Sequence, residues 1–208
     1  TTEVATKTRT FEDKLAPFPA FLIGYKIPAR RTPEFNALYL GGQLLYGGDS
    51  SRLYQKLVKT DKTVLQLFGS TDERRGPSLV YIGAIPKPNT DPKVIRQVIF
   101  DEIKNLSTTA PTAYEMERLR NGLIDGEVRG RQSSLYRSQQ LALYTLYDDN
   151  PALVNDELNT LLAITPEQIR AAVAKYLNTE NRAELDVVPA KKTTAPPAAT
   201  TTNPAKGK

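Results

Sequence analysis

The arrangement of apolar and polar positions in the first part of the chain predicts strands. β-Branched and charged residues alternate over 4–11, as expected of a half-buried strand. An apolar, partly aromatic run covers 20–26 between flanking prolines. Two more strands are predicted at 64–70 and 78–85, and the turn-forming cluster at 72–77 predicts that they form a hairpin.

Start and stop signals predict the first helices. Thr32 is placed as an N-cap, Pro33 occupies the first helical position, and the glycine pair 47–48 ends the helix. Asp49 or Ser50 is expected to cap a second, short helix. The glycine pairs of this region match no phosphate-binding fingerprint, so helix packing and C-capping explain them.

Beyond the hairpin, apolar residues recur every three to four positions, which predicts a run of helices. Their expected starts are Asp91-Pro92, the capping box Thr112 to Glu115, about Ser134, Asn150-Pro151 and Thr165-Pro166. A last strand is predicted at 182–188. Hairpin strands followed by clustered helices indicate an α+β fold, in which helices cover one face of a mostly antiparallel sheet that the last strand joins.

The chain is expected to consist of one folded domain followed by a tail. Residues 1–189 form a single α+β domain without an internal linker. Residues 190–208 are rich in Thr, Pro, Ala and Lys and contain no large apolar side chain. Such a segment buries too little surface to offset its ordering entropy, so it is expected to be a disordered tail.

The net charge of +5 is concentrated in that tail, which holds four lysines and no acid, so the body is nearly neutral. A nearly neutral body argues against a nucleic-acid partner, which requires a basic stripe on the folded part. The short runs Arg30-Arg31 and Arg129-Gly130-Arg131 are expected to be solvated surface. Apolar runs such as Phe21-Leu22-Ile23 are too short to span a bilayer.

The chain contains no histidine and no cysteine. Catalytic zinc almost always requires imidazole or thiolate ligands, and a Ser-His-Asp triad or Cys-His pair requires those side chains too. The chain by itself is therefore expected to have no such catalytic site and no zinc site. The close acidic pairs leave open a paired-carboxylate site of the glycosidase type, although residues one or two apart do not face each other on a helix. These pairs are Asp101/Glu102, Glu115/Glu117 and Asp148/Asp149.

One segment resembles a known family. Residues 44–57, Leu-Leu-Tyr-Gly-Gly-Asp-Ser-Ser-Arg-Leu-Tyr-Gln-Lys-Leu, are similar to the Gly-x-x-Ser-Ser-Arg-Leu-(Phe/Tyr)-x-x-Leu stretch of the pitrilysin/insulinase family of zinc peptidases, which includes mitochondrial processing peptidase. Weaker similarities follow in the family's order at 20–25, 115–126 and 164–169, so the resemblance covers roughly residues 18–189.

The resemblance implies a paired architecture. Family members combine two related α+β halves around a peptide-binding chamber, and one half carries a His-x-x-Glu-His motif that holds zinc and the general base. The other half is metal-free and supplies chamber wall and substrate contacts. Because this chain has no histidine, it resembles the metal-free half, and zinc is expected only in a partner half, on the same or another polypeptide.

The chain departs from the family at two positions. Active members often carry an Arg and, seven residues later, a Tyr that contacts the substrate near the scissile bond. The matching positions here are Val58 and Leu65, whose side chains cannot donate a hydrogen bond. Arg52, Lys59 and Tyr81 are candidate substitutes, although Arg52 is better explained as a helix-surface ion pair.

The departure leaves functions from different classes open. The chain completes a zinc metallopeptidase, or it is a catalytically inactive family member that acts as a structural subunit or a peptide-binding protein. The start of the chain shows neither the basic nor the apolar region of a signal peptide. Because the chain does not open with Met, it is expected to be a mature form or an excised fragment. The absence of cysteine and the Lys-ended tail favour a periplasmic or secreted location, with the cytoplasm left open.

Overall fold

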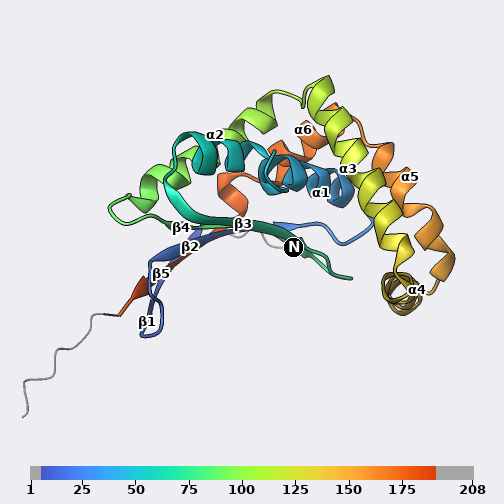
Figure 1. Cartoon of the computed structure of the whole chain (residues 1–208), viewed down its shortest axis with the longest axis horizontal. Helices are drawn as coiled ribbons and strands as arrows, with labels where there is room; N and C mark the ends of the chain where they lie inside the picture. The colour runs from blue at the N-terminus through green and yellow to red at the C-terminus, as the bar shows by residue number, and fades with distance from the viewer. Residues whose placement is uncertain (1–5, 191–208) are drawn as a thin grey trace, which may run out of the picture.

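A five-stranded sheet carries the helices on one face (Figure 1). The structure is a computed structural model that describes residues 6–190. The strand order is β1-β5-β2-β4-β3. The strands are β1 (Lys7–Asp13), β2 (Ala20–Ile27), β3 (Val64–Asp72), β4 (Ser78–Pro86) and β5 (Arg182–Pro189). Only the β1–β5 pair is parallel, so the predicted α+β fold with a mostly antiparallel sheet is confirmed, and the last strand joins it between β1 and β2.

The centre of the sheet supplies the strand side of the core. Along β2 every second side chain is buried, beginning at Phe21 and ending at Ile27. On the antiparallel neighbour β4, Val80 and Ile82 are buried on the same face, where the helices cover them. Successive strand residues point to opposite faces, so Leu22 and Tyr81 lie on the face away from the helices.

The prediction of a half-buried first strand was wrong. In β1, every residue before Asp13 is exposed. This strand pairs only with β5, in parallel, and forms one edge of the sheet. Its alternating residues predicted the strand itself correctly, but an edge strand beyond the helical layer has no core to bury its side chains.

Helix α1 (Pro33–Tyr46) lies between the sheet and the outer helices (Figure 1). Thr32 caps it by accepting a hydrogen bond from the backbone N–H of Phe35, and Pro33 occupies its first turn, as the sequence predicted. Gly48 follows its end with φ of +80°, a conformation that glycine adopts without steric penalty. Both sides of α1 are buried, which is typical of a central helix.

The short second helix is present but is wound as a π-helix, η1 (Tyr54–Thr60). The expected cap by Asp49 or Ser50 was wrong. No side chain caps this helix, and the Gln55 side chain instead donates to the backbone carbonyl of Asp49. Wide π-turns are rare and often mark functional segments.

The later helices begin close to where the sequence predicted. They are α2 (Pro92–Thr108), α3 (Ala113–Gln132), α4 (Ser134–Asp148), α5 (Glu157–Leu162) and α6 (Pro166–Tyr176), with short 3₁₀ turns η2 (Pro151–Asn155) and η3 (Thr179–Asn181). Asp91, Thr112 and Thr165 cap their helices, the last two as full capping boxes. The helix expected from Asn150 starts as the 3₁₀ turn and becomes α-helical only at Glu157.

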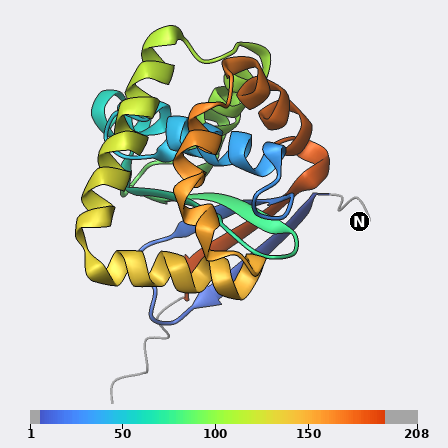
Figure 2. The same ribbon diagram turned by 90° about the vertical axis from the view of Figure 1, so that its right-hand side faces the viewer.

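Helices α3, α4 and α5 form a frame at one end of the molecule. Figure 2 shows α3 running down to α4, which lies across the end of the fold, with α5 beside α1. Within residues 6–190, no helix is long and apolar enough to cross a membrane. The expected disordered tail lies, apart from Ala190, outside the described residues.

Candidate functional site

The segment after α1 that carries the family resemblance is anchored to α3. Ser51 and Leu53 are fully buried, which fixes the turn that follows Gly48. Between them, the guanidinium of Arg52 binds Glu115 with Nε–Oε1 at 2.7 Å and Nη2–Oε2 at 3.0 Å. Arg52 therefore forms an ion pair, and its charge is already neutralised by a carboxylate rather than held free for a substrate.

The two positions that depart from the family lie around the end of η1. Val58 packs against the hydrophobic core. Leu65 is 49% exposed and lies at an irregularity in the pairing of β3 with β4. Lys59 is exposed, with its Nζ 5.6 Å from the centre of the Tyr54 ring. Among Val58, Leu65 and Lys59, only the lysine presents a polar group.

Tyr81 lies in a different part of the sheet. It pairs with Ser70 on β3, five residues beyond Leu65. At a strand rise of about 3.3 Å per residue, this places Tyr81 roughly 16 Å from Leu65 along the sheet. Arg52, Lys59 and Tyr81 therefore lie on separate elements, and Tyr81 cannot occupy the position that Leu65 holds.

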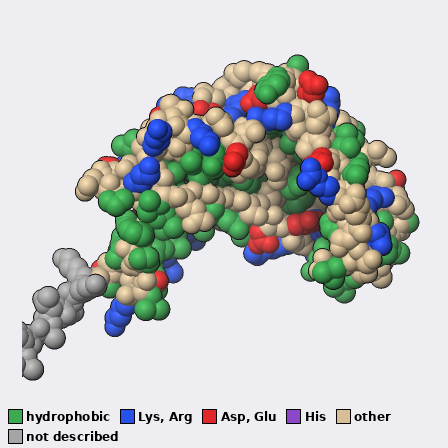
Figure 3. All heavy atoms as spheres, in the orientation of Figure 1, with side chains coloured by type: hydrophobic (Ala, Val, Ile, Leu, Met, Phe, Trp, Pro, Cys, Tyr) green, Lys and Arg blue, Asp and Glu red, His purple; other side chains and the backbone are tan. Residues whose placement is uncertain are grey.

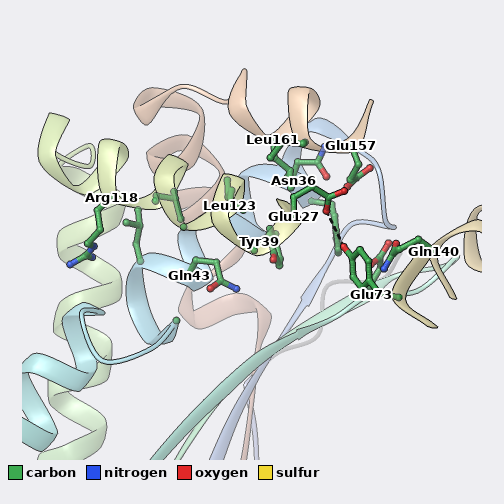
Figure 4. Close-up of a pocket in the computed structure, with 18 of the residues that line it drawn as sticks. Asn36, Tyr39, Gln43, Glu73, Arg118, Leu123, Glu127, Gln140, Glu157 and Leu161 are labelled. Atoms are coloured by element: carbon green, nitrogen blue, oxygen red, sulfur yellow. Dashed lines mark hydrogen bonds between the residues drawn. The ribbon is translucent and has the colours of Figure 1, made fainter. Parts of the chain in front are cut away.

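A polar cleft elsewhere in the molecule contains none of the candidate residues from the sequence. It has a volume of about 520 Å³, and α1, α3, α4 and α5 supply most of its walls (Figure 4). Asn36, Tyr39 and Gln43 come from α1, and Gln140 comes from α4. Leu119, Leu123, Leu158 and Leu161 supply apolar surface. A volume of this size is within the usual range for ligand sites, about 300–1,000 Å³.

The acidic side chains of the cleft are already paired with arginines. Glu127 pairs with Arg131 and accepts a hydrogen bond of 3.0 Å from the hydroxyl of Tyr136. Glu157 lies 3.1 Å from Nη1 of Arg31. These neighbours neutralise the carboxylates, so the cleft offers no free carboxylate pair for acid–base catalysis.

Tyrosines of the cleft remain protonated at neutral pH. Burial, together with the hydrogen bond to Glu127, raises the pKa of Tyr136 to about 12. Burial and the charge of Glu157 raise the pKa of Tyr144 as well, and burial with the charges of Glu73 and Glu157 raises that of Tyr39. These hydroxyls are hydrogen-bond donors rather than nucleophiles, so the cleft is suited to binding.

One wall of the cleft is held in place by Arg30, and the prediction that this residue is solvated surface was wrong. The residue is only 7% exposed and pairs with Glu73 and Asp148. Its guanidinium carbon lies 5.4 Å from the ring centre of Tyr144 and 5.5 Å from that of Tyr147. These partners come from the β3–β4 hairpin and from the end of α4, which local sequence does not place beside Arg30.

A second hollow, of about 610 Å³, lies on the face of the sheet away from the helices. Leu22, Gly24, Ala183 and Leu185 line it together with β1 residues. Hydrophobic side chains gather over this part of the molecule, near β1, β2 and β5 (Figure 3). The surface is predominantly apolar and contains no cluster of catalytic groups.

The acidic side chains do not assemble into a metal site either. Among residues 6–190, no group of three or more His, Cys, Asp or Glu side chains is placed to hold a metal ion. The resemblance implies zinc only in a partner half, so no zinc-dependent step is assigned to residues of this chain.

Comparison with models of known protein families identifies one family. A family model described as "Peptidase M16 inactive domain" matches residues 1–123. A search of curated proteins finds no significant match.

Several solved structures share the fold. A protease from Helicobacter pylori aligns with a TM-score of 0.84 at 19% identity, covering 90% of this chain and 45% of that one. An inactive peptidase domain from Bordetella parapertussis aligns with a TM-score of 0.76 at 24% identity, covering 90% of this chain and 98% of that one. The periplasmic protease PqqL from Escherichia coli aligns with a TM-score of 0.66 at 12% identity, covering 89% of this chain and 21% of that one.

Proposed function

Because the chain belongs to the peptidase M16 inactive domain family, we propose that it is the non-catalytic half of a zinc metallopeptidase. The observation that carries the proposal is the family match over residues 1–123, in a chain with no histidine. A half bearing His-x-x-Glu-His, on the same or a partner polypeptide, would hold the zinc and the general base. This chain would close the peptide-binding chamber.

Relative lengths support a role as one half of a larger protein. The chain spans 45% of the length of the Helicobacter pylori protease that it resembles, whereas it spans 98% of the inactive domain from Bordetella parapertussis. A domain of this fold therefore occurs both within a longer protease chain and as a separately solved unit.

The sheet offers a means of holding an extended peptide without sequence preference. Strands β1 and β3 are its two edges. An edge strand presents unpaired N–H and C=O groups that an added strand can bind through main-chain hydrogen bonds. The apolar hollow beside β1 would add contacts to side chains of that peptide.

We also propose that the protein is periplasmic or secreted. A periplasmic or secreted setting accords with the absence of cysteine from the chain and with the fold shared with a periplasmic protease of Escherichia coli. Cell fractionation with an antibody against this chain tests the location, and recovery in the cytoplasmic fraction would contradict it.

Reconstitution tests the principal proposal. The purified chain should contain no stoichiometric zinc and should cleave no peptide, whereas adding the half with His-x-x-Glu-His should yield zinc-dependent cleavage. A matched mixture, in which the zinc-binding histidines of that half are replaced by alanine, should remain inactive. Zinc binding and turnover by this chain alone would refute the assignment.

Val58 and Leu65 favour a second candidate function, that of a catalytically inactive assembly or peptide-binding protein. Neither side chain can stabilise charge near a scissile bond. If this alternative holds, the reconstituted pair should cleave no member of a broad quenched-peptide library even when the partner's zinc motif is intact. Robust cleavage would eliminate it.

A further inference from the structure

A third hollow, of about 450 Å³, lies between α4, which crosses the end of the fold in Figure 2, and the 3₁₀ turn η2 that packs back against it. Its volume is within the usual range for ligand sites. Its apolar walls come from α4 and η2 and consist mainly of Leu141, Pro151, Ala152 and Val154. Arg131 and Arg137 also line the hollow, whereas none of its lining residues is Asp or Glu. The hollow is therefore apolar and positively charged.

Hydrogen bonds of the two arginines place both charges at one end of the hollow. Nη2 of Arg131 donates to the backbone carbonyl of Val154 at 2.9 Å, which connects the end of α3 to η2. Nη1 of Arg137 donates to the backbone carbonyl of Arg131. Leu141 lies one helical turn after Arg137, roughly 6 Å farther along α4. The hollow thus has a charged end near α3 and an apolar end at Leu141 and the start of η2.

The positive charge of Arg137 is not neutralised within the described chain. Arg131 pairs with Glu127, but the two hydrogen bonds of the Arg137 guanidinium go to uncharged groups, the Arg131 carbonyl and the Ser134 hydroxyl at 3.1 Å. Within residues 6–190, Arg137 forms no salt bridge. A guanidinium has five N–H groups, so these two contacts leave donors for a carboxylate, which arginine can bind through two parallel hydrogen bonds.

The Tyr136 ring gives the hollow one wall whose position is already fixed. The ring packs on α3 at Gly130, where an added Cβ would lie 2.9 Å from it, and its hydroxyl donates to Glu127 at 3.0 Å. Tyr136 also lines the cleft between α1, α3, α4 and α5, so its ring separates that cleft from this hollow. Because these contacts exist without a ligand, binding in the hollow does not have to order this side chain.

We propose that the hollow between α4 and η2 binds a small amphipathic monocarboxylate of the medium-chain fatty acid class. The carboxylate lies at the charged end, where Arg137 binds it, and the hydrocarbon tail lies against Leu141 and the start of η2. An inorganic anion would leave the apolar walls in water, and an uncharged hydrocarbon would leave Arg137 without a counter-charge. The site lies within this chain, so the inference does not depend on the proposed peptidase function.

Titration of the isotopically labelled 208-residue chain with sodium octanoate tests the site, with backbone amide signals as the readout. Saturable shifts should centre on Leu141, Ala152 and Val154 at roughly millimolar octanoate. Butanoate should bind at least about tenfold more weakly, because it buries fewer methylenes. Neutral 1,2-octanediol and cationic octyltrimethylammonium should bind at least about fivefold more weakly, because they lack the carboxylate. Absence of saturation, equal binding of the neutral probe, or shifts centred on Leu22 and Leu185 would overturn the proposal.

Two substitutions separate the charged end from the apolar end. Arg137→Gln removes the charge but keeps a donor for the carbonyl of Arg131, and it should weaken octanoate binding at least about fivefold while leaving 1,2-octanediol binding unchanged. Leu141→Ser should weaken the binding of both probes, because it removes apolar wall. Both side chains are exposed, so neither substitution should unfold the chain. Unchanged octanoate binding in either variant would contradict the proposed orientation of the ligand.

Arg129→Gln and Leu146→Ser are the matched controls. Arg129 lies in the last turn of α3 and Leu146 on α4, both are exposed, and neither lines the hollow. Octanoate should bind these two variants as tightly as it binds the unmodified chain. If the controls lose as much binding as Arg137→Gln and Leu141→Ser, octanoate responds only to the overall charge and apolar surface of the chain, and the proposed site is refuted.

Discussion

Arg52 and Glu115, 63 residues apart in the sequence, form a two-pronged ion pair that joins the segment after α1 to the first turn of α3. Glu115 also completes the capping box of α3, accepting a hydrogen bond of 2.9 Å from the backbone N–H of Thr112. One carboxylate thus holds a helix start and a distant chain segment together. The strength of both contacts depends on its negative charge.

Protonation of Glu115 should weaken the fold in acid. Burial alone would raise the pKa of this carboxyl, but hydrogen bonds from Arg52 and Thr112 outweigh it and lower the pKa to about 2. An unfolded glutamate has a pKa of about 4.3, so the contribution is full above about pH 5 and is lost as the pH falls towards 2. We expect Glu115→Gln to lower the free energy of unfolding at pH 7 by about 1–2 kcal/mol, allowing for solvent screening.

Urea unfolding at pH 7 and pH 3 measures this effect. The difference in stability between Glu115→Gln and the unmodified chain should shrink at pH 3. Glutamine can still serve at this position of a capping box, so the loss reports the charge. Glu117→Gln, an exposed neighbour on the same helix, is the control. A pH-independent difference would contradict the assignment.

Replacing Arg30 should be strongly destabilising. Its guanidinium pairs with two carboxylates and lies beside two tyrosine rings, so Arg30→Met leaves Glu73 and Asp148 unpaired. Removing one partner of a buried ion pair costs about 3–5 kcal/mol, and the partial exposure of Glu73 places the expected loss near the lower end.

Arg30→Lys should rescue little of that stability, because an ammonium group cannot reproduce the planar fork that binds both acids. Arg31→Lys, with a single carboxylate partner, should lose much less. Thermal unfolding of Arg30→Met, Arg30→Lys and Arg31→Lys checks this order of stability losses. Equal losses of stability at positions 30 and 31 would contradict the prediction.

Gly69 should not tolerate a side chain. An added Cβ there would lie 2.6 Å from Cγ of Tyr46, whose ring packs directly on the β3 backbone and whose hydroxyl contacts Thr71 at 3.1 Å. We expect Gly69→Ala to destabilise the fold by about 1–3 kcal/mol through overpacking. Chemical denaturation measures this loss of stability. Gly24→Ala is the control: its added Cβ meets no neighbouring atom, so we expect it to be neutral or stabilising.

Leu65→Tyr should be accepted by the fold and should increase cleavage by the reconstituted peptidase. Leu65 is half exposed, so the substitution should alter Tm by no more than about 2 °C. If position 65 lies near the scissile bond, as the family resemblance implies, the added hydroxyl would restore a donor there, and we expect the cleavage rate to rise at least about tenfold. Val58→Arg, at a position packed on the core, should lower Tm instead. An unchanged rate with Leu65→Tyr would favour the catalytically inactive alternative.

The sequence by itself determined the secondary structure wherever the signal is local. Thr112 and Thr165 lie three residues before their capping partners, so each box forms from neighbouring residues whatever the rest of the chain does. The segments 20–26 and 78–85 were likewise correctly predicted as strands, which are β2 and β4. The absence of histidine and cysteine was also enough to exclude the common zinc and nucleophile sites, because those sites require imidazole or thiolate groups.

Only the tertiary structure decided which side chains are buried by distant partners. Arg30 looks like surface in the sequence because its acids lie 43 and 118 residues away. The β1 residues look half-buried because the pattern does not reveal that the strand forms an edge. The cleft between α1, α3, α4 and α5 was missed for the same reason. The spacing of Gly122 and Gly126 is visible in the sequence. Whether an aromatic ring packs against a glycine of α3, as Tyr136 does at Gly130, depends on how α4 turns back on α3.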